Sequence, residues 1–363
     1  MRLILSKTLF FAFMSFFMLG YGKINSQTLF TIDNYRIPTG VRAAVVGKVH
    51  NGSIKRSPDD KIVYRIIKDT AGIFKIDSEG IISLKRNKTA LPDGPFRYAV
   101  TISAASRGKK KRVEIKEFEL VKDQFLKNMV VAHRGAWKES AAPQNSIKAL
   151  KNAIDIGCSW SEFDLWMSAD GIPVCNHDPS IKGHKVEETS ASILTSVELS
   201  PGEYLPTVEQ YIRTAMEQNK TGLVVEIKPS GISLERTLEL TEKVVNLVHN
   251  LKAQAWVSYI SFSYESLERV LELDPMAKTA YLGSNKSVDE VSTSRMWGID
   301  FNISLFKRDP LLTAKAKEKG LTVNVWTVNS QEDLQLMIDM GVDFITTNEP
   351  ELLFRMINQN KDK

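Results

Sequence analysis

The second part of the chain alternates short apolar runs with amphipathic stretches. Eight apolar runs follow one another between residues 129 and 348: MVVAHRG, SEFDLWM, LVVEIK, VSYISFS, KTAYLG, GIDFNISL, LTVNVWTV and VDFITTN. Stretches with helical periodicity lie between or after them, at 145–156, 207–217, 234–251, 266–273, 310–319, 331–340 and 351–357. Eight strand–helix units over roughly 240 residues are what a (β/α)8 barrel requires. We therefore predict an α/β fold, a TIM barrel over residues 123–363.

The preceding part has a different pattern, with β-rich runs separated by turn residues and no sustained helical period. The runs are KIVYRIIKD, GIFKIDSEGIISLKR, FRYAVTISAAS and KRVEIKEFELV. They predict a small all-β, sandwich-like domain over residues 28–122, in front of the barrel. FKIDSEGIISLKR and RYAVTISAAS also resemble the repeat unit of cadherin-like domains. The acidic clusters of cadherin calcium sites are not evident, so this resemblance implies a shape and no metal.

The first 27 residues have the charge and length of a secretory signal peptide. Arg2 and Lys7 precede an uncharged apolar run over 9–19, and small and polar residues follow. The run is shorter than the about 20 apolar residues that span a bilayer comfortably. We expect residues 1–27 to be a signal peptide and the protein to be periplasmic or extracellular.

Composition excludes several classes of protein. Of the 363 residues, 43% are hydrophobic and 25% are charged, which excludes a disordered chain, a collagen-like repeat and a multi-span membrane protein. The two cysteines, Cys158 and Cys175, cannot form a disulfide framework and lack the histidine spacing of a zinc site.

The net charge of +5 hides an asymmetry along the chain. Residues 23–122 hold 21 Lys or Arg against 10 Asp or Glu, whereas residues 123–363 hold 25 against 33. The basic front part is compatible with contact to an anionic lipid surface or a glycan, or with a solvated basic face. No nucleic acid is expected as a partner, because the positive charge lies on the β-rich part and no nucleic-acid-binding motif is present.

Two neighbouring strands of the predicted barrel carry three carboxylates. Glu162 and Asp164 lie two residues apart, as do Glu226 and Lys228, so each pair faces one side of its strand. An inward carboxylate cluster is costly without a cation, and oxygen ligands favour Mg²⁺ or Ca²⁺. The alternative is a metal-free network of ion pairs with Lys228 and Arg134.

Two histidines also end apolar strands of this region. His133 ends the first barrel strand, and His177 ends a short strand that follows the turn at 170–173. Facing three carboxylates and flanked by Arg134 and Lys228, they complete the parts needed for phosphodiester hydrolysis. These parts are a metal ion and cationic side chains to offset charge, and histidines to transfer protons.

The motifs of the barrel, in order, resemble the glycerophosphodiester phosphodiesterase family, which has relatives among sphingomyelinase D toxins. The resemblance covers about residues 129–353 and rests on VVAHRGA, APQNSIKAL, SEFDLWMSADGIPVCNHD, LPTVEQ, LVVEIK, ISFS, VNVWTVN and MGVDFITTNEPEL. It implies catalytic roles for His133 and His177, phosphate binding by Arg134 and Lys228, and one divalent cation, Ca²⁺ or Mg²⁺, on Glu162, Asp164 and Glu226. Trp326 matches a tryptophan that packs against the glycerol or alcohol part of the substrate, and its alternative is a barrel-wall aromatic.

The activity that this resemblance implies is hydrolysis of glycerophosphodiesters to glycerol 3-phosphate and an alcohol. Metal-assisted chemistry with two-histidine acid–base catalysis is expected, with water or a neighbouring substrate hydroxyl as the nucleophile. Which histidine is the acid and which the base stays open. The alternatives are phospholipase D-like cleavage of lysophospholipids and a noncatalytic phosphodiester-binding module.

Two positions and one segment depart from the family pattern. Gln144 replaces a glutamate in the usual Pro-Glu-Asn-Thr, and Asn348 replaces an aspartate near the C-terminus. The segment 179–204 is also shorter than the capping insertion of many relatives, which predicts a more open mouth.

Overall fold

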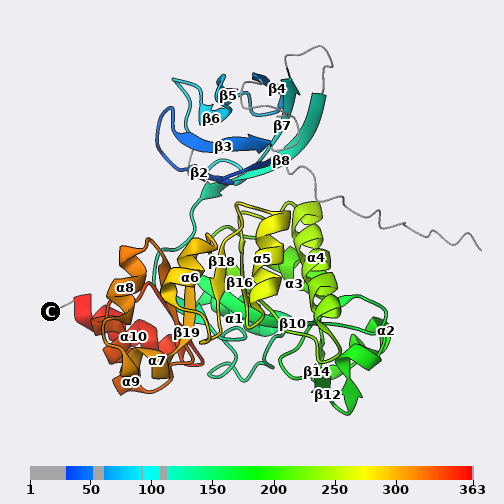
Figure 1. Cartoon of the computed structure of the whole chain (residues 1–363), viewed down its shortest axis with the longest axis vertical. Helices are drawn as coiled ribbons and strands as arrows, with labels where there is room; N and C mark the ends of the chain where they lie inside the picture. The colour runs from blue at the N-terminus through cyan, green and yellow to red at the C-terminus, as the bar shows by residue number, and fades with distance from the viewer. Residues whose placement is uncertain (1–29, 52–60, 91–92, 107–112, 362–363) are drawn as a thin grey trace, which may run out of the picture.

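The computed structural model describes residues 30–51, 61–90, 93–106 and 113–361, and the predicted signal peptide lies outside these residues. The described chain forms an all-β part stacked on a barrel with an outer layer of helices (Figure 1). None of the helices in the described ranges combines the length and the apolar character needed to cross a membrane.

The all-β part consists of two four-stranded sheets. One has the order β1 (Phe30–Ile32), β3 (Val45–Asn51), β6 (Ile81–Leu84), β5 (Phe74–Ile76), and the other the order β2 (Arg36–Pro38), β8 (Val113–Asp123), β7 (Arg97–Ser106), β4 (Ile62–Asp69). Alternate residues of these strands fill the space between the sheets, where Phe30 and Phe118 meet edge to face. The predicted all-β arrangement is confirmed, and three strands that the sequence pattern did not mark, β1 to β3, complete it.

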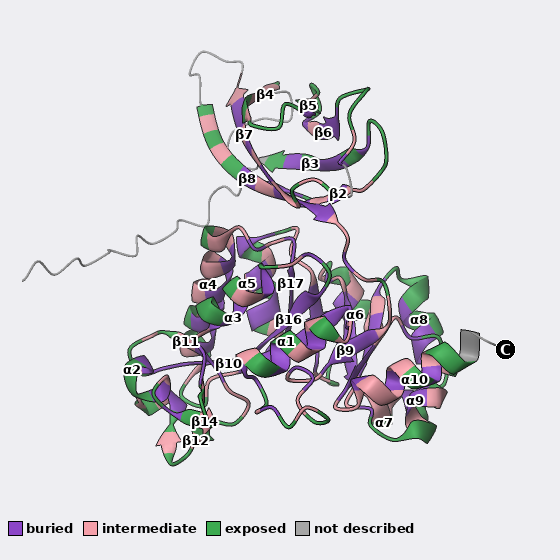
Figure 2. Ribbon diagram, turned by 180° about the vertical axis from the view of Figure 1, so that it is seen from behind, coloured by how far each residue is buried: buried purple, intermediate pink, exposed green. Residues whose placement is uncertain are grey.

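The barrel has the eight predicted strands. In chain order they are β9 (Val130–Ala132), β10 (Trp160–Met167), β16 (Gly222–Ile227), β17 (Val257–Ser261), β18 (Thr279–Tyr281), β19 (Gly298–Asn302), β20 (Thr322–Trp326) and β21 (Phe344–Thr347). Neighbours pair in parallel, and β9 pairs with both β10 and β21, which closes the sheet. The strands are almost wholly buried (Figure 2), which explains their continuous apolar runs.

The outer helices bury one apolar face each against the strands. The seven predicted helices are present as α1 (Ile147–Asp155), α3 (Val208–Ala215), α4 (Leu234–Leu251), α5 (Tyr264–Leu273), α8 (Leu312–Glu318), α9 (Gln331–Asp339) and α10 (Pro350–Lys361). Three short helices, α2 (Ala191–Leu194), α6 (Val288–Thr293) and α7 (Ile303–Arg308), were not predicted. α7 begins within the last three residues of the run GIDFNISL, which was assigned to a strand, because the Asn302 side chain accepts from Ser304 N and starts a helix there.

A compact segment covers one side of the barrel mouth between β10 and α3. It contains β11 (Pro173–Cys175), β12 (Ser180–Ile181), β13 (His184–Lys185), η1 (Val186–Glu188), α2 (Ala191–Leu194), β14 (Glu198–Ser200) and β15 (Glu203–Tyr204). Its small core includes Trp166, Val186 and Leu194. Glu187 fixes it to the start of α4, because its carboxylate accepts from Arg236 Nε and Gly231 N, both at 3.0 Å.

The all-β part packs on the N-terminal ends of the barrel strands. Arg36 Nε donates to Ala255 O at 2.9 Å, just before β17, and the Arg36 guanidinium lies 3.5 Å from the centre of the Phe125 ring. Asn219 Nδ2, just before β16, donates to Lys122 O at 2.9 Å. The all-β part therefore covers the end of the barrel opposite to the strand ends where barrel enzymes place their chemistry (Figure 1).

Candidate active site

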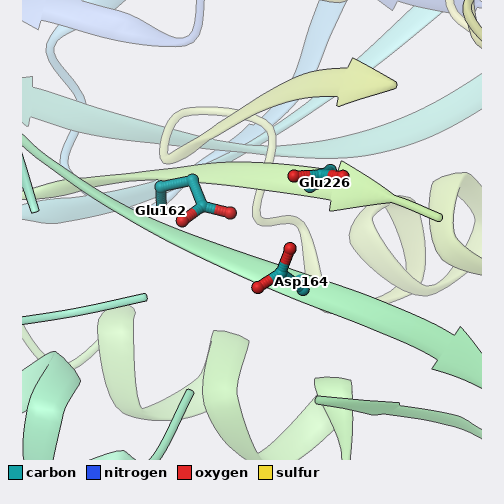
Figure 3. Close-up of side chains that lie close together, drawn as sticks. All are labelled: Glu162, Asp164 and Glu226. Carbon is teal, nitrogen blue, oxygen red and sulfur yellow. The ribbon is translucent and has the colours of Figure 1, made fainter. Parts of the chain in front are cut away.

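Three carboxylates meet inside the barrel near the C-terminal ends of two adjacent strands. Glu162 and Asp164 come from β10 and Glu226 from β16, where Asp164 and Glu226 are paired in register. Each offers an oxygen atom, and these atoms lie within 4.8 Å of one another (Figure 3). All three residues are buried. The inward alternation expected from the sequence is thus observed.

Two cations contact this cluster. Lys228 Nζ lies 2.8 Å from Asp164 Oδ1 and 2.5 Å from Glu226 Oε1, and Arg134 Nε lies 3.5 Å from Asp164 Oδ2. Glu162 Oε2 accepts from the backbone N of Arg134 at 2.8 Å. Its other oxygen, Oε1, is buried and has no hydrogen-bond partner among the described residues.

The carboxylates cannot all be ionised easily in this setting. Burial and the neighbouring Asp164 raise the pKa of Glu226 to about 8, and the same two effects raise the pKa of Glu162 well above its usual range. Burial also acts to raise the pKa of Asp164, but Lys228, His177 and Asn145 together outweigh it and the pKa lies below its usual value. The cluster is therefore short of positive charge.

The donor set fits a hard divalent cation. All three side chains supply carboxylate oxygens, which Ca²⁺ and Mg²⁺ prefer, and the orphaned Glu162 Oε1 lacks any other partner among the described residues. The structure thus holds a buried acidic group that could bind one divalent metal ion, whereas the described cysteines, Cys158 and Cys175, are free and buried.

The two histidines reach the mouth from different elements and have different partners. His133 follows β9, its backbone N donates to Thr347 O at 3.0 Å, and its ring Nδ1 lies 2.7 Å from Asn348 Oδ1. Burial, reinforced by Arg134, lowers the pKa of His133 to about 4. His177 follows β11, is partly exposed, and has its Nδ1 2.7 Å from Asp178 Oδ1.

The turn after β9 requires a glycine. Gly135 has φ +79°, and a Cβ on it would lie 2.6 Å from the Cβ of Ala149 in α1. This close approach of turn and helix brings Arg134 to the cluster and to Gln144, whose Oε1 accepts from an Arg134 guanidinium nitrogen at 2.6 Å. The glutamine at position 144, where the family pattern has glutamate, therefore contacts Arg134 and not the three carboxylates.

Sequence reasoning missed two polar partners at the site. Asn145 Nδ2 donates to Asp164 Oδ2 and Asn145 Oδ1 accepts from Asp164 N, both at 3.0 Å. Asp178 pairs with His177. Both stand directly beside residues that the sequence marked, Gln144 and His177, and that adjacency was the only sign of them.

Trp326 lies apart from the charged cluster, at the end of β20. Its indole Nε1 donates to Asp300 O at 2.9 Å, and its ring meets Phe262 edge to face with the centres 5.5 Å apart. It also packs against the apolar cluster inside the barrel that includes Val131 and Ile260. The ring is therefore both part of the barrel wall and half-exposed at the strand ends.

The family model of the glycerophosphoryl diester phosphodiesterase family matches residues 133–352, a span that holds every site residue described above. The chain belongs to this family. A glycerophosphodiester phosphodiesterase of Caldanaerobacter subterraneus subsp. tengcongensis is 29% identical over 248 residues, which are 64% of this chain and 99% of that protein.

Solved structures of the family agree. A glycerophosphodiester phosphodiesterase of Parabacteroides distasonis is 34% identical, with a TM-score of 0.63 over 65% of this chain and 99% of its own. A phosphodiesterase of Oleispira antarctica, solved in complex with the product sn-glycerol-3-phosphate, shares the fold at 24% identity with a TM-score of 0.56 over 63% and 96% of the two chains. The predicted family, the barrel fold and the glycerophosphodiester phosphodiesterase class of enzyme are confirmed.

Proposed function

We propose that the chain hydrolyses glycerophosphodiesters to glycerol 3-phosphate and an alcohol with the help of one divalent cation, Ca²⁺ or Mg²⁺. The observation that carries the proposal is the buried group of Glu162, Asp164 and Glu226, with oxygens within 4.8 Å of one another. These residues are the proposed ligands. A bound cation supplies Lewis-acid stabilisation of the phosphate oxygens.

The charges of the site support a phosphodiester as the ligand. Three carboxylates and the cations Arg134 and Lys228 leave one negative charge, so a divalent ion brings the site to a net charge of +1. A phosphodiester carries one negative charge and matches this value. Arg134 and Lys228 are the proposed phosphate-binding residues, and they offset the charge that builds up on phosphorus-bound oxygens as the bond to the leaving group breaks.

His133 and His177 are the proposed pair for proton transfer. One takes the proton from the attacking hydroxyl, which belongs to water or to the glycerol part of the substrate, and the other gives a proton to the leaving alkoxide. Their separate partners are Asn348, which follows β21, and Asp178, which follows β11, so the two rings are held by different elements. Trp326, with Phe262 beside it, is the proposed apolar contact for the glycerol or alcohol part.

The test is hydrolysis of sn-glycero-3-phosphocholine followed by ³¹P NMR in the presence of Ca²⁺ or Mg²⁺. We expect glycerol 3-phosphate as the phosphorus-containing product. The variant Glu226→Gln loses turnover at least 100-fold, as expected for loss of a metal ligand. Glu268→Gln, the same change on the exposed surface of α5, keeps it. Equal turnover of both variants, or choline phosphate as the product, would contradict the proposal.

A second candidate substrate class is lysophospholipids. The loops that follow β10, β16 and β17 at the mouth end of the barrel expose six large apolar side chains: Ile172, Ile193, Tyr204, Ile232, Leu234 and Phe262. Such side chains favour substrates with an acyl chain. Rates on lysophosphatidylcholine and glycerophosphocholine under the same conditions separate the two candidates, and a higher kcat/KM on the lipid favours the second.

We also propose that the basic face of the all-β part contacts an anionic surface. Arg42, Arg86 and Lys88 are exposed and make no ion pair within the described ranges. Co-sedimentation with vesicles of anionic lipid tests the contact, with vesicles of neutral lipid as the control. Equal binding to both kinds of vesicle would contradict the proposal.

We also propose that residues 1–27 direct export of the protein to the periplasm or the cell exterior. It predicts that the chain, expressed in full in a bacterial host, is recovered outside the cytoplasm with an N-terminus between residues 21 and 28. Recovery in the cytoplasm at full length would contradict it.

A further inference from the structure

A fourth buried carboxylate lies inside the barrel, and the proposed reaction does not use it. Asp300 of β19 is 1% exposed and is paired in register with Asn324 of β20. Asn324 hydrogen-bonds the carboxylate, but the oxygen Oδ1 of Asp300 is buried and has no hydrogen-bond partner among the described residues. A buried polar atom without a partner is costly, so a ligand at this oxygen would stabilise the barrel.

The charge of Asp300 is also uncompensated. Burial raises the pKa of Asp300 to about 7, and no charged side chain in the described ranges contributes to the shift. Lys278, at the N-terminal end of the barrel, is acted on by Arg36 and Asp123 and not by Asp300. The carboxylate therefore either holds a proton or takes its counter-charge from solution.

A cavity of about 20 Å³ lies beside Asp300 in the barrel interior. Ser258 and Thr322 contribute hydroxyl groups to its lining. Ser258 Oγ donates to Leu223 O at 3.4 Å and Thr322 Oγ1 donates to Trp297 O at 3.0 Å, so both hydroxyl protons are already used and the oxygen lone pairs remain available. The cavity has room for one particle of about the size of a water molecule.

Aromatic rings form another part of the cavity wall. Trp160, Trp297 and Phe344 line it, and the centres of neighbouring rings are 5.9–6.5 Å apart. The faces of such rings attract cations, and the Lys278 ammonium already lies 5.3 Å and 5.8 Å from the ring centres of Trp297 and Trp160. A carboxylate, two hydroxyl oxygens and aromatic rings together suit a cation. One carboxylate balances one positive charge, which favours a monovalent ion over a divalent one.

We propose that Asp300 binds a potassium ion in this cavity, with the hydroxyl oxygens of Ser258 and Thr322 as further ligands. A potassium ion is about as large as a water molecule and fits the space. None of the three carboxylates proposed to hold the divalent ion lines the cavity, so the two sites are separate and this one does not depend on the proposed hydrolysis. The ion balances the charge of Asp300 beneath Trp326, whose indole Nε1 donates to Asp300 O at 2.9 Å.

The first test locates the ion. Crystals grown in RbCl, in which Rb⁺ stands in for K⁺ and gives an anomalous diffraction signal, should show an anomalous peak in contact with Asp300 Oδ1. The variant Asp300→Asn has nearly the same shape and should show no peak there. A water molecule without an anomalous peak in the unsubstituted protein would overturn the proposal, as would a peak that persists in Asp300→Asn.

The second test measures stability in solution. Thermal unfolding is followed at pH 8 in EDTA, in KCl or in choline chloride of the same concentration, because choline is too large for the cavity. We expect the Tm to be about 2 °C or more higher in KCl. In Asp300→Asn this difference should disappear, and the Tm in choline chloride should not fall, because no uncompensated carboxylate is left. An equal Tm of the unsubstituted protein in the two salts would contradict the proposal.

Two control variants show whether the effect belongs to Asp300. Asp155→Asn, at the exposed end of α1, is the matched control and should keep the full difference between the salts. Glu226→Gln should keep it as well, because the cluster at the mouth is not the proposed potassium site. Loss of the difference in Glu226→Gln would place the potassium ion at the mouth and overturn the proposal.

A further variant keeps the proposal testable if Asp300→Asn does not fold. Thr322→Val removes one ligand oxygen and keeps the shape of the side chain. The KCl concentration that gives half of the increase in Tm should then rise several-fold. An unchanged concentration dependence in Thr322→Val would contradict the proposed set of ligands.

Discussion

Lys228 follows Glu226 by two residues and its Nζ lies 2.5 Å from Glu226 Oε1; Lys228 and Arg134 are the Lys and Arg side chains that form ion pairs with the three buried carboxylates among the described residues. Together they balance two of the three. A metal-free network of ion pairs therefore leaves one carboxylate that must hold a proton or stay uncompensated, and the raised pKa values of Glu162 and Glu226 express this.

Cation binding is expected to release protons. Ligand carboxylates must be ionised, and the pKa of Glu226 in the cation-free site is about 8. Affinity for Ca²⁺ or Mg²⁺ should therefore rise with pH between about 6 and 8. Calorimetry in two buffers with different ionisation enthalpies measures the number of protons released. Binding without proton release at pH 7 would contradict this description of the cluster.

The stability of the cation-free protein should fall as pH rises. The folded state binds the Glu226 proton more tightly than the unfolded chain does, because the pKa of this carboxyl is about 8 in the folded protein and near 4.5 in the unfolded chain. That stability is fully present below about pH 4.5 and is lost as pH rises through about 8. His133 acts in the opposite range, since its pKa of about 4, against 6.5 in the unfolded chain, costs stability as pH falls below 6.5.

Thermal unfolding in EDTA tests this sign. We expect the Tm to decrease by at least about 2 °C between pH 6.5 and pH 8.5. Added cation at about 100 times its Kd restores about 2.7 kcal/mol. In Glu226→Gln the side chain cannot ionise, so the Tm should depend less on pH. An equal dependence of Tm on pH in the variant and the unsubstituted protein would contradict the role given to Glu226.

Gln144 is expected to act on substrate affinity through Arg134. Gln144→Ala removes the acceptor 2.6 Å from the guanidinium, so Arg134 is less well held for phosphate, and KM should rise about 10-fold while cation affinity is unchanged. Gln359→Ala on the exposed face of α10 is the control. A loss of cation binding in Gln144→Ala would show that the residue supports the carboxylates instead.

The contact between the all-β part and the barrel should affect stability and leave catalysis alone. Arg36→Ala removes the contact with Phe125 and the bond to Ala255 O, and should cost about 1–3 kcal/mol in the free energy of unfolding. Arg42→Ala, an exposed arginine in the same part, should cost less than about 0.5 kcal/mol. Urea unfolding measures both. A fall in kcat/KM for Arg36→Ala would mean that this interface reaches the mouth.

The barrel and its carboxylates could be predicted because both follow from local periodicity. Buried strands are continuous apolar runs, and residues two apart on a strand face one side, which places Glu162 with Asp164 and aligns them with Glu226. The end of the β19 run could not be predicted in the same way. The capping bond from Asn302 decides there between strand and helix, and apolar residues such as Ile303 suit either.

The contacts that organise the site depend on closure of the barrel and are invisible to local pattern. His133 and Asn348 are 215 residues apart and meet only because β9 and β21 are neighbours. Asn145 reaches Asp164 from a backbone conformation with φ +58°. The hydrogen bond from Arg36 to Ala255 O helps to position the all-β part on the barrel. These residues are 219 apart, and no local pattern in either segment predicts their contact.

The most direct test of the central claim is release of glycerol 3-phosphate from glycerophosphocholine by the protein beginning at Thr28, measured with Ca²⁺, with Mg²⁺ and after EDTA. The account predicts turnover that EDTA abolishes and that one of the two cations restores. Turnover that persists in EDTA, or diester binding without turnover in both cations, would contradict a cation-dependent hydrolase built on Glu162, Asp164 and Glu226.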